Sequence, residues 1–429
     1  MTPVFDSRPL TPAEKYYTFL DIVTPMNVVV AGDLDRCLAA DLVAQRWTQF
    51  TSLRSLPRLR IRGDLTLADG DAADSAFNAH EAAADGWDEY LARELRRPFG
   101  LDRPMRCLYL TSAAENRSRL VFIAHHAVVD GRVGVAELQM FVRLLDGRAI
   151  PHQQRLSVAP ASSKQLRWRS DRQELISLLR EIAARNDAAG APDPASWPRP
   201  DVERRPRLVS LTVAPAEAAG LLAAAKSRGM RAHSAIAAAW LIAAARRVGE
   251  RPHPTLQLSS PVDLAVPSPD PDRPTAPAVS VVAHRHQVTP QSPWELAQRV
   301  GAATDASISR GEAELFFHLT RVEAIDDLEA GARVVAHALA SAPPAISVSN
   351  MGVISADGDP DWLRTVYGIL APTPNQMVFA SAVSYRGCLT HSVGTDDTQL
   401  PADVIGSLID DYRAVVRTMG SAEPVAGTG

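Results

Sequence analysis

Two adjacent histidines, followed by an aspartate and a glycine, are the residues of this chain best suited to acid–base chemistry. His125 and His126 directly follow the apolar run 120–124, and Asp130 and Gly131 precede an amphipathic segment. An imidazole can take a proton near neutral pH if its other nitrogen is bonded and its tautomer is thereby fixed. The pattern therefore predicts a general base at a strand–loop–helix junction. Gly131 would let a substrate pass close to the backbone there.

Asp130 has two possible roles in such a unit. It could bond a histidine nitrogen directly, or it could hold the loop by pairing with an arginine. The alternative to chemistry is that His125 and His126 are hydrogen-bonded core residues at the end of a strand. That interpretation suits an isolated histidine, whereas the seven-residue pattern at this junction favours a reactive site.

The elements that must position these residues indicate an α/β protein. Apolar runs predict strands at 26–32, 105–110 and 119–124, and helical spacing predicts helices at 34–49 and 134–145. The second half repeats this alternation, with predicted strands at 207–213, 255–260, 278–286, 345–349, 378–384 and 389–394 and predicted helices at 215–229, 234–248 and 407–418. A proline-rich connector separates the halves. We therefore expect two domains, 1–190 and 205–429, joined by a linker at 191–204.

Length and composition indicate an ordinary soluble protein of two domains. The chain has 429 residues, whereas single hydrophobic cores stop growing at about 250–300 residues. A net charge of −4 argues against nucleic acid as a partner. The three cysteines form no CxxC pair, the first residues lack the features of a signal peptide, and the apolar run 235–245 is too short to span a bilayer. We expect a cytoplasmic monomer without a transmembrane segment.

At His125–Gly131 the chain resembles the condensation-domain superfamily of acyltransferases, whose signature is HHxxxDG. Four further segments are similar to superfamily elements, in the same order: Pro9–Tyr17 to the N-terminal opening, Arg97–Arg106 to the PFDLxxGPLxR segment, Ser260–Leu264 to PVDLR and Ser347–Gly352 to SNxG. The chain is most similar to the polyketide-associated acyltransferases of the phthiocerol dimycocerosyl transferase type. Two features differ from the pattern, because Ala265 replaces the arginine of PVDLR and the segment 49–58 lacks the usual histidine.

The resemblance implies two chloramphenicol-acetyltransferase-like mixed-sheet domains with the active-site channel between them. It implies His126 as the general base, His125 as its supporting neighbour and Asp130 as a structural residue that pairs with an arginine. The candidate arginines cluster in one strand-like stretch and are Arg54, Arg58, Arg60 and Arg62. Gly131, Ser349 and Asn350 would bind substrate. Ser349 and Asn350 could stabilise an oxyanion, or they could simply end a strand.

The implied reaction moves an acyl group from a CoA or carrier-protein thioester to a hydroxyl acceptor, as in lipid or polyketide ester formation. No cofactor or metal is implied, because the thioester is itself a substrate. The enzymatic alternatives are an amide-forming condensation enzyme, which uses an amine acceptor, and a wax-ester synthase. An alternative of another class is a non-catalytic module of the same fold that binds a carrier protein. The sequence contains no GxSxG or HExxH motif, which disfavours a serine hydrolase and a zincin.

Two other groups of residues have both a functional and an ordinary interpretation. His284 and His286 would share one face of a strand, which suits a metal ion. Because no third ligand is evident, we prefer a solvent-facing strand. Arginines near 167–172 and 204–207 could dock an acidic carrier protein, although charge clusters usually only face solvent.

Overall fold

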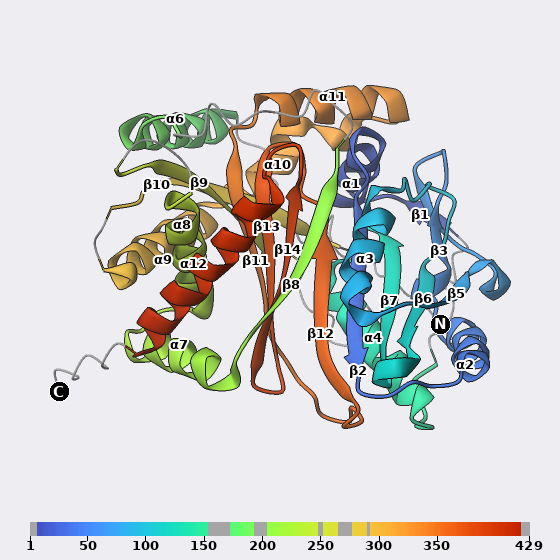
Figure 1. Ribbon diagram of the computed structural model, residues 1–429. Coiled ribbons are helices and arrows are strands. Elements are labelled where there is room, and N and C mark those ends of the chain that lie inside the picture. Colours follow the sequence, from blue (N-terminus) through green and yellow to red (C-terminus); the bar gives the residue numbers. More distant parts are fainter. Residues whose placement is uncertain are drawn as a thin grey trace.

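Two α/β lobes lie side by side in the computed structural model, which describes residues 7–152, 172–192, 204–247, 252–264, 277–289 and 292–421 (Figure 1). The N-terminal lobe contains a five-stranded mixed sheet in the order β12-β2-β7-β6-β5. The C-terminal lobe contains a six-stranded mixed sheet in the order β10-β9-β11-β13-β14-β8. A small sheet, β1-β4-β3, flanks the N-terminal lobe. The prediction of an α/β fold with two mixed sheets is confirmed.

The strands are β1 (Ser7–Pro9), β2 (Asn27–Leu34), β3 (Leu59–Ile61), β4 (Thr66–Asp69), β5 (Phe77–Glu81), β6 (Arg106–Ser112), β7 (Arg117–His125), β8 (Pro206–Val213), β9 (Thr255–Asp263), β10 (Val279–Gln287), β11 (Ala345–Ile354), β12 (Leu363–Leu370), β13 (Gln376–Tyr385) and β14 (Cys388–Asp396). The α-helices are α1 (Pro12–Val23), α2 (Ala40–Leu53), α3 (Trp87–Arg96), α4 (Gly131–Leu145), α6 (Arg172–Ala189), α7 (Pro215–Ser227), α8 (Ala232–Ala245), α9 (Pro293–Arg310), α10 (Glu312–Thr320), α11 (Leu328–Ser341) and α12 (Ala402–Ser421).

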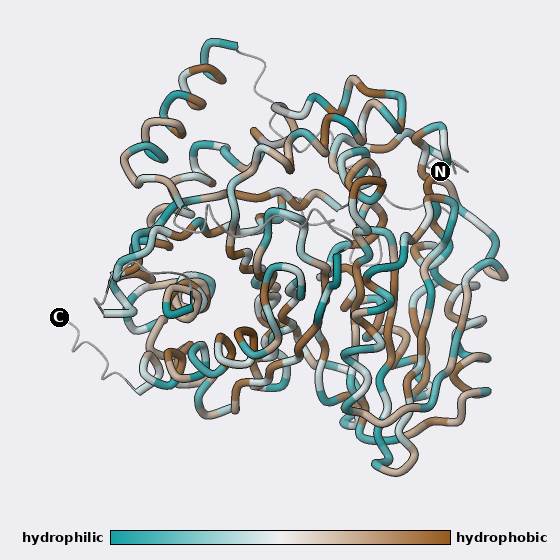
Figure 2. The backbone as a smooth tube through the Cα atoms, turned by 45° about the horizontal axis from the view of Figure 1, so that its top comes forward, coloured by the Kyte–Doolittle hydropathy of each residue, from teal (hydrophilic) through white to brown (hydrophobic). Residues whose placement is uncertain are grey.

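Each sheet is covered by helices that bury its apolar face. Helices α1, α2 and α4 share one hydrophobic core with β2 and β7, and α7, α8, α9 and α12 form a second core with the six-stranded sheet. Helix α3 lies between the lobes, because it packs on the opposite face of the N-terminal sheet and against β8. Figure 2 shows hydrophobic stretches along the strands of the N-terminal lobe, at the right of that view. Burial of these faces is the main favourable contribution to folding.

The two lobes exchange elements. Strand β12 comes from the C-terminal part of the chain but pairs antiparallel with β2, with Val366 opposite Gly32. Helix α6 comes before the expected linker but packs against β10, and its Arg185 forms an ion pair with Glu312 at 2.8 Å. Most of the expected linker, at 193–203, lies outside the described residues. Each half of the chain therefore contributes an element that packs on the other lobe.

Candidate functional site

A cavity of about 340 Å³ lies between the lobes, and residues from both lobes line it. The N-terminal lobe contributes His126, Asp130 and Gly131, and the C-terminal lobe contributes Ser349 and Asn350. Segments that are more than 200 residues apart in sequence thus meet at one cavity. His125 is the one candidate site residue that does not line it.

His126 has the surroundings of a neutral imidazole. Its residue surface is only 7% exposed, and its ring stacks on Tyr17 with centroids 3.9 Å apart and planes 20° apart. Burial lowers the pKa of His126 to about 4, and nearby backbone groups of His126 and Val129 oppose this shift in part. Nδ1 is buried without a hydrogen-bond partner of standard geometry. Nε2 is therefore the nitrogen available to a molecule in the cavity.

His125 does not line the cavity, and its contacts are structural. Its Nδ1 accepts a hydrogen bond from the Ala127 N–H at 3.0 Å, so Nε2 carries the proton in the neutral ring. Nε2 lies 3.6 Å from Asp21 Oδ2, which is longer than a hydrogen bond. Burial lowers the pKa of His125 to about 3. These contacts fix the turn after β7 and thereby the backbone that carries His126.

Asp130 is the N-cap of α4. We expected it to pair with an arginine, and it does not do so among the described residues. Its carboxylate accepts a hydrogen bond from the Val133 N–H at 2.9 Å. No arginine within the described ranges forms a salt bridge with it. Three of the four candidate arginines have other partners: Arg54 pairs with Glu137, Arg58 with Asp69 and Arg60 with Asp74. Burial raises the pKa of Asp130 to about 6. The motif aspartate therefore starts the helix that follows it.

Gly131 lines the cavity, and the space that a side chain would need is already filled. A Cβ at this position would lie 2.6 Å from Met351 Sδ, and one at Gly368 would lie 2.9 Å from Met351 Cε. Helix α4, strand β11 and strand β12 thus approach closely around one methionine. The close approach to the Gly131 backbone, which we expected a substrate to make, is made here by the Met351 side chain.

Ser349 and Asn350 lie at a bulge of β11, and both side chains are half-buried at the cavity. The Oδ1 of Asn350 accepts a hydrogen bond from the Gly352 N–H at 2.9 Å, which assigns the amide orientation. Its Nδ2 is then oriented as a donor away from that turn. Oxyanion stabilisation and a structural role in the strand are therefore compatible for this pair. The amide oxygen of Asn350 holds the turn, while its NH2 group and the Ser349 hydroxyl remain as donors.

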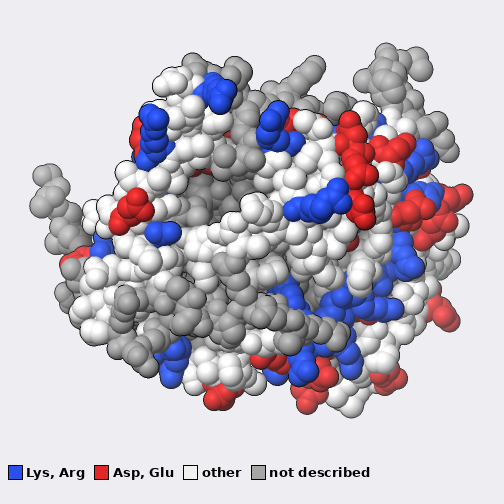
Figure 3. Space-filling view, turned by 90° about the horizontal axis from the view of Figure 1, so that it is seen from above, with Lys and Arg blue, Asp and Glu red and all other residues white. Residues whose placement is uncertain are grey.

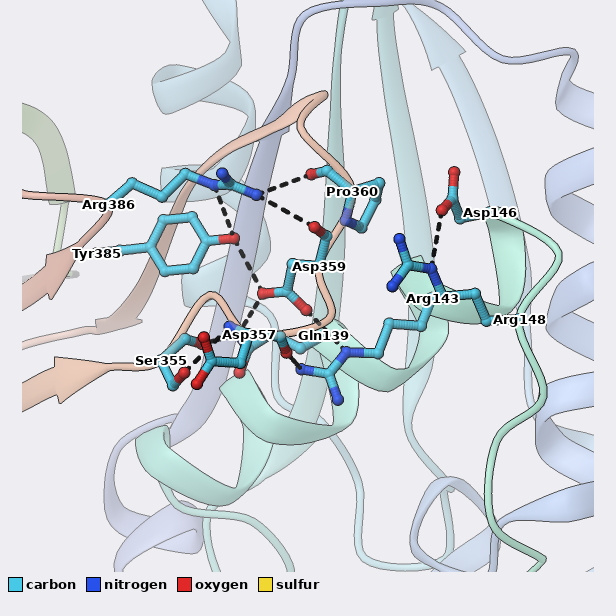
Figure 4. A network of polar contacts seen from close by, with 10 residues as sticks. All are labelled: Gln139, Arg143, Asp146, Arg148, Ser355, Asp357, Asp359, Pro360, Tyr385 and Arg386. Carbon is cyan, nitrogen blue, oxygen red and sulfur yellow. Dashed lines mark hydrogen bonds and ion pairs between the residues drawn. The ribbon is translucent and has the colours of Figure 1, made fainter.

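Helix α4 is held at its far end by a buried carboxylate from the connection between β11 and β12. Asp359 accepts hydrogen bonds from Gln139, from Arg143 at 2.8 Å and from the Tyr385 hydroxyl at 2.9 Å (Figure 4). Arg386 donates to the carbonyl oxygens of Asp359 and Pro360. This network fixes the helix after the motif relative to the C-terminal lobe.

Tyr17 and Asp263 also line the cavity, although no motif singled them out. Tyr17 ends the Pro9–Tyr17 segment, in which a capping box starts α1: Thr11 accepts from the Glu14 N–H, and Glu14 accepts from the Thr11 N–H. Asp263 ends β9, in the PVDL segment. Position 265, where alanine replaces the expected arginine, lies outside the described residues. Both residues were thus within recognised segments, but their role at the cavity depends on tertiary structure.

The other candidate groups lie apart from the cavity. His284 and His286 are buried, so a solvent-facing strand was wrong, and His284 Nε2 lies 2.8 Å from Ser307 Oγ. Arg204 forms an ion pair with Asp396, and Arg207 forms one with Asp397. Of the other candidate arginines, those at 167–171 lie outside the described residues. On the face seen from above, basic side chains gather at the lower right of Figure 3 and acidic ones at its right edge.

Within the described segments no three metal-ligating side chains cluster, and none of the helices could cross a membrane.

Comparison with known proteins identifies this architecture. Residues 202–382 match the family described as phthiocerol/phthiodiolone dimycocerosyl transferase C-terminus. The structure of polyketide synthase associated protein 5 from Mycobacterium tuberculosis is similar over 98% of this chain and 100% of that chain, at a TM-score of 0.63 and 15% identity. Residues 202–382 thus match this acyltransferase family, and the chain has the condensation-domain fold.

Two further solved structures share this fold. The EpoB NRPS cyclization-docking bidomain from Sorangium cellulosum matches at a TM-score of 0.67 and 16% identity, covering 97% of this chain and 86% of that one. The first condensation domain of the calcium-dependent antibiotic synthetase, in complex with substrate analogue 3a, matches at 0.67 and 15%, covering 98% and 97%. No curated protein sequence matches significantly. The two-lobed chloramphenicol-acetyltransferase-like fold is therefore confirmed, and fold and family support an acyltransferase or condensation-type role.

Proposed function

We propose that this protein transfers an acyl group from a CoA or carrier-protein thioester to a hydroxyl acceptor, with His126 as the general base. The observation that carries the proposal is a buried histidine, His126, at a cavity that residues of both lobes line. A general base must be deprotonated before it can act, and burial, which lowers the pKa of His126, favours the deprotonated form at neutral pH. The apolar side chains at the cavity, which include Leu20, Met26, Val28, Ile369 and Phe379, suit an acyl chain.

In the proposed reaction, Nε2 of His126 takes the proton of the acceptor hydroxyl as its oxygen attacks the thioester carbonyl carbon. The new C–O bond turns the carbonyl oxygen into an oxyanion, for which the Ser349 hydroxyl and the Asn350 NH2 group are the candidate donors. Collapse of this tetrahedral intermediate breaks the C–S bond. The thiolate then takes the proton from the imidazolium, so the products are an ester and a free thiol.

The decisive experiment measures ester formation by mass spectrometry with a panel of acyl-CoA donors and lipid or polyketide alcohols. Replacing His126 with alanine should lower kcat/KM by about 10²–10⁴, the range for general acid–base catalysis. The exposed His80 of the same lobe provides the control, because His80→Ala should leave the rate unchanged. Full turnover by the His126→Ala variant would contradict the proposal.

The oxyanion donors can be tested separately from the base. Ser349→Ala should lower kcat by roughly 10²–10³ if its hydroxyl stabilises the oxyanion, with little change in KM. Among the described residues the Ser349 hydroxyl has no hydrogen-bond partner, so we expect this substitution to disturb the local structure little. Asn350→Ala would also remove the bond to the Gly352 N–H and is the less specific variant.

The same assay separates the alternatives. Turnover of amines alone would favour an amide-forming condensation enzyme, and turnover of long-chain alcohols alone would favour a wax-ester synthase. Equilibrium binding of a carrier protein without turnover of any thioester would favour a non-catalytic module. We place the reaction in the cytoplasm and assign it to a monomer. The unpaired state of Cys37, Cys107 and Cys388 supports a reducing compartment.

A further inference from the structure

Tyr17 makes the most direct aromatic contact with His126 and belongs to a different element. Its ring is nearly parallel to the imidazole, with centroids 3.9 Å apart. Tyr17 lines the cavity but is only 8% exposed, so its ring covers one face of His126. Its hydroxyl donates a hydrogen bond to the Val279 carbonyl at 2.8 Å. One side chain thus touches His126 with its ring and the first residue of β10 with its hydroxyl.

Tyr17 is itself held rigidly. Tyr16 meets its ring edge-on at a centroid distance of 5.7 Å. Helix α1 is anchored by its capping box and by Lys15, whose Nζ donates to the Ile325 carbonyl at 2.9 Å. Two residues after Tyr17, Phe19 packs so closely on α11 that a Cβ at Gly331 would lie 2.4 Å from its ring. The ring of Tyr17 therefore has little freedom to move away from His126.

The phenol of Tyr17 cannot replace His126 as the base. Burial raises the pKa of Tyr17 far above its usual value, and the charges of Asp130 and Asp263 raise it further. Tyr17 is thus a neutral ring at neutral pH. Its possible contributions are to fix the plane of the imidazole and to keep water from one of its faces.

We propose that Tyr17 is a positioning residue for His126, which holds the imidazole plane at the cavity and couples that position to the opposite lobe through Val279. The proposal rests on the proposed function of His126. Stacked aromatic rings restrain each other's orientation, and a misplacement of about 1 Å can cost roughly 10² in rate. The hydrogen bond to β10 makes this restraint depend on the relative position of the two lobes.

The test combines kinetics with the titration of His126. Tyr17→Leu should lower kcat by about 10–100-fold with little change in KM. It should also shift the acid limb of the pH–rate profile upward toward pH 6.5, because water then reaches the imidazole. Other charged or titratable groups around this position are Tyr16 of α1, His125 of β7, Asp130 at the N-cap of α4, Arg132 of α4 and Asp263 of β9, and all remain in the variant.

Conservative and matched variants separate positioning from general damage. Tyr17→Phe keeps the stack but removes the hydrogen bond to Val279, so its acid limb should stay close to that of the wild type while its kcat falls by less than in Tyr17→Leu. Tyr17→Met, which fills similar space without a ring, replaces the leucine variant if that one does not fold. Tyr90→Leu is the control, because Tyr90 makes a ring contact with His80 outside the cavity, at 5.0 Å. It should change neither kcat nor the acid limb.

NMR titration of histidines labelled at Cε1, with the His126 signal assigned by its loss in His126→Ala, measures the pKa without turnover. A folded Tyr17→Leu or Tyr17→Met protein with wild-type kcat and an unchanged His126 titration would overturn the inference. Full turnover by His126→Ala would instead overturn the proposed function. The titration would still show in that case whether Tyr17 controls the ring, so the two failures can be distinguished.

Discussion

Arg143 and Asp359 form an ion pair at 2.8 Å that joins α4 to the connection between β11 and β12. The Asp359 side chain is fully buried, whereas that of Arg143 is 32% exposed. Gln139 and Tyr385 complete the coordination of this carboxylate. The helix that begins at the HHxxxDG motif is thereby bound to the C-terminal lobe two to three turns beyond its start. We expect this network to contribute to stability more than to the chemical step.

Asp359→Ala should therefore lower the free energy of unfolding by about 3 kcal/mol, the lower end of the range for breaking a buried ion pair. The remaining Arg143, Gln139 and Tyr385 lose a charged acceptor, which is the main cost. Urea unfolding measures the change. Glu329→Ala removes an exposed pair with Arg333 and should change stability by less than about 0.5 kcal/mol. Equal effects of the two substitutions would contradict a specific role for the buried network.

Gly131 and Met351 should show coupled effects. Gly131→Ala places a methyl group where Met351 Sδ lies, so the methionine must move toward the cavity. We expect a loss of about 1 kcal/mol in stability and a raised KM. In the double variant, Met351→Ala frees the required space and should restore KM. A double-mutant cycle on KM and unfolding free energy measures the coupling, and strict additivity would argue against this contact as the reason for glycine.

Asp130 should behave as a helix cap. Asp130→Asn keeps an acceptor for the Val133 N–H and should retain both stability and most of the activity. Asp130→Ala removes the cap and should cost about 1 kcal/mol of stability. If Asp130 were instead a proton relay, the asparagine variant would lose activity while remaining stable. Kinetic and unfolding measurements on the same two variants therefore decide between these roles.

Local patterns predicted much of the fold and the outline of the site. The predicted strand at 119–124 and helix at 134–145 correspond to β7 and α4, because apolar runs and helical spacing are encoded locally. The same patterns gave no sheet order. That β12 pairs with β2 in the opposite lobe depends on the long-range packing of both lobes, which no single segment carries.

The site shows the same limit. The motif indicated His126 as the group facing the cavity, but the N-cap role of Asp130 depends on a local hydrogen bond that competes with any ion pair. The expected pairing of Asp130 with one of the four candidate arginines is not seen, and Arg54 and Arg58 pair instead with the buried carboxylates of Glu137 and Asp69. The sequence did not predict Tyr17 as a site residue, because its contact with His126 joins residues more than 100 positions apart.

Buried neutral histidines should make this protein sensitive to acid. Burial lowers the pKa values of the following side chains to between about 3 and 4: His125, His126, His233, His284, His286 and His391. Their pKa values in the unfolded chain lie near 6.5, so the unfolded chain binds more protons below that pH. The free energy of unfolding should therefore fall as the pH decreases from about 6.5 toward 4. Each group can contribute up to about 1.4 kcal/mol per pH unit.

Asp130 acts in the opposite direction over part of this range, because burial raises its pKa to about 6 and protonation then favours the folded chain. Urea unfolding at pH 7.5, 6 and 5 measures the net slope. His391→Gln isolates one contribution: glutamine can still bond the Tyr412 hydroxyl, which lies 2.8 Å from His391 Nε2, but it does not titrate. Its stability should fall less steeply with acid than that of the wild type, whereas the exposed-site control His337→Gln should follow the wild type. Parallel curves for all three proteins would show that His391 does not contribute to the acid sensitivity.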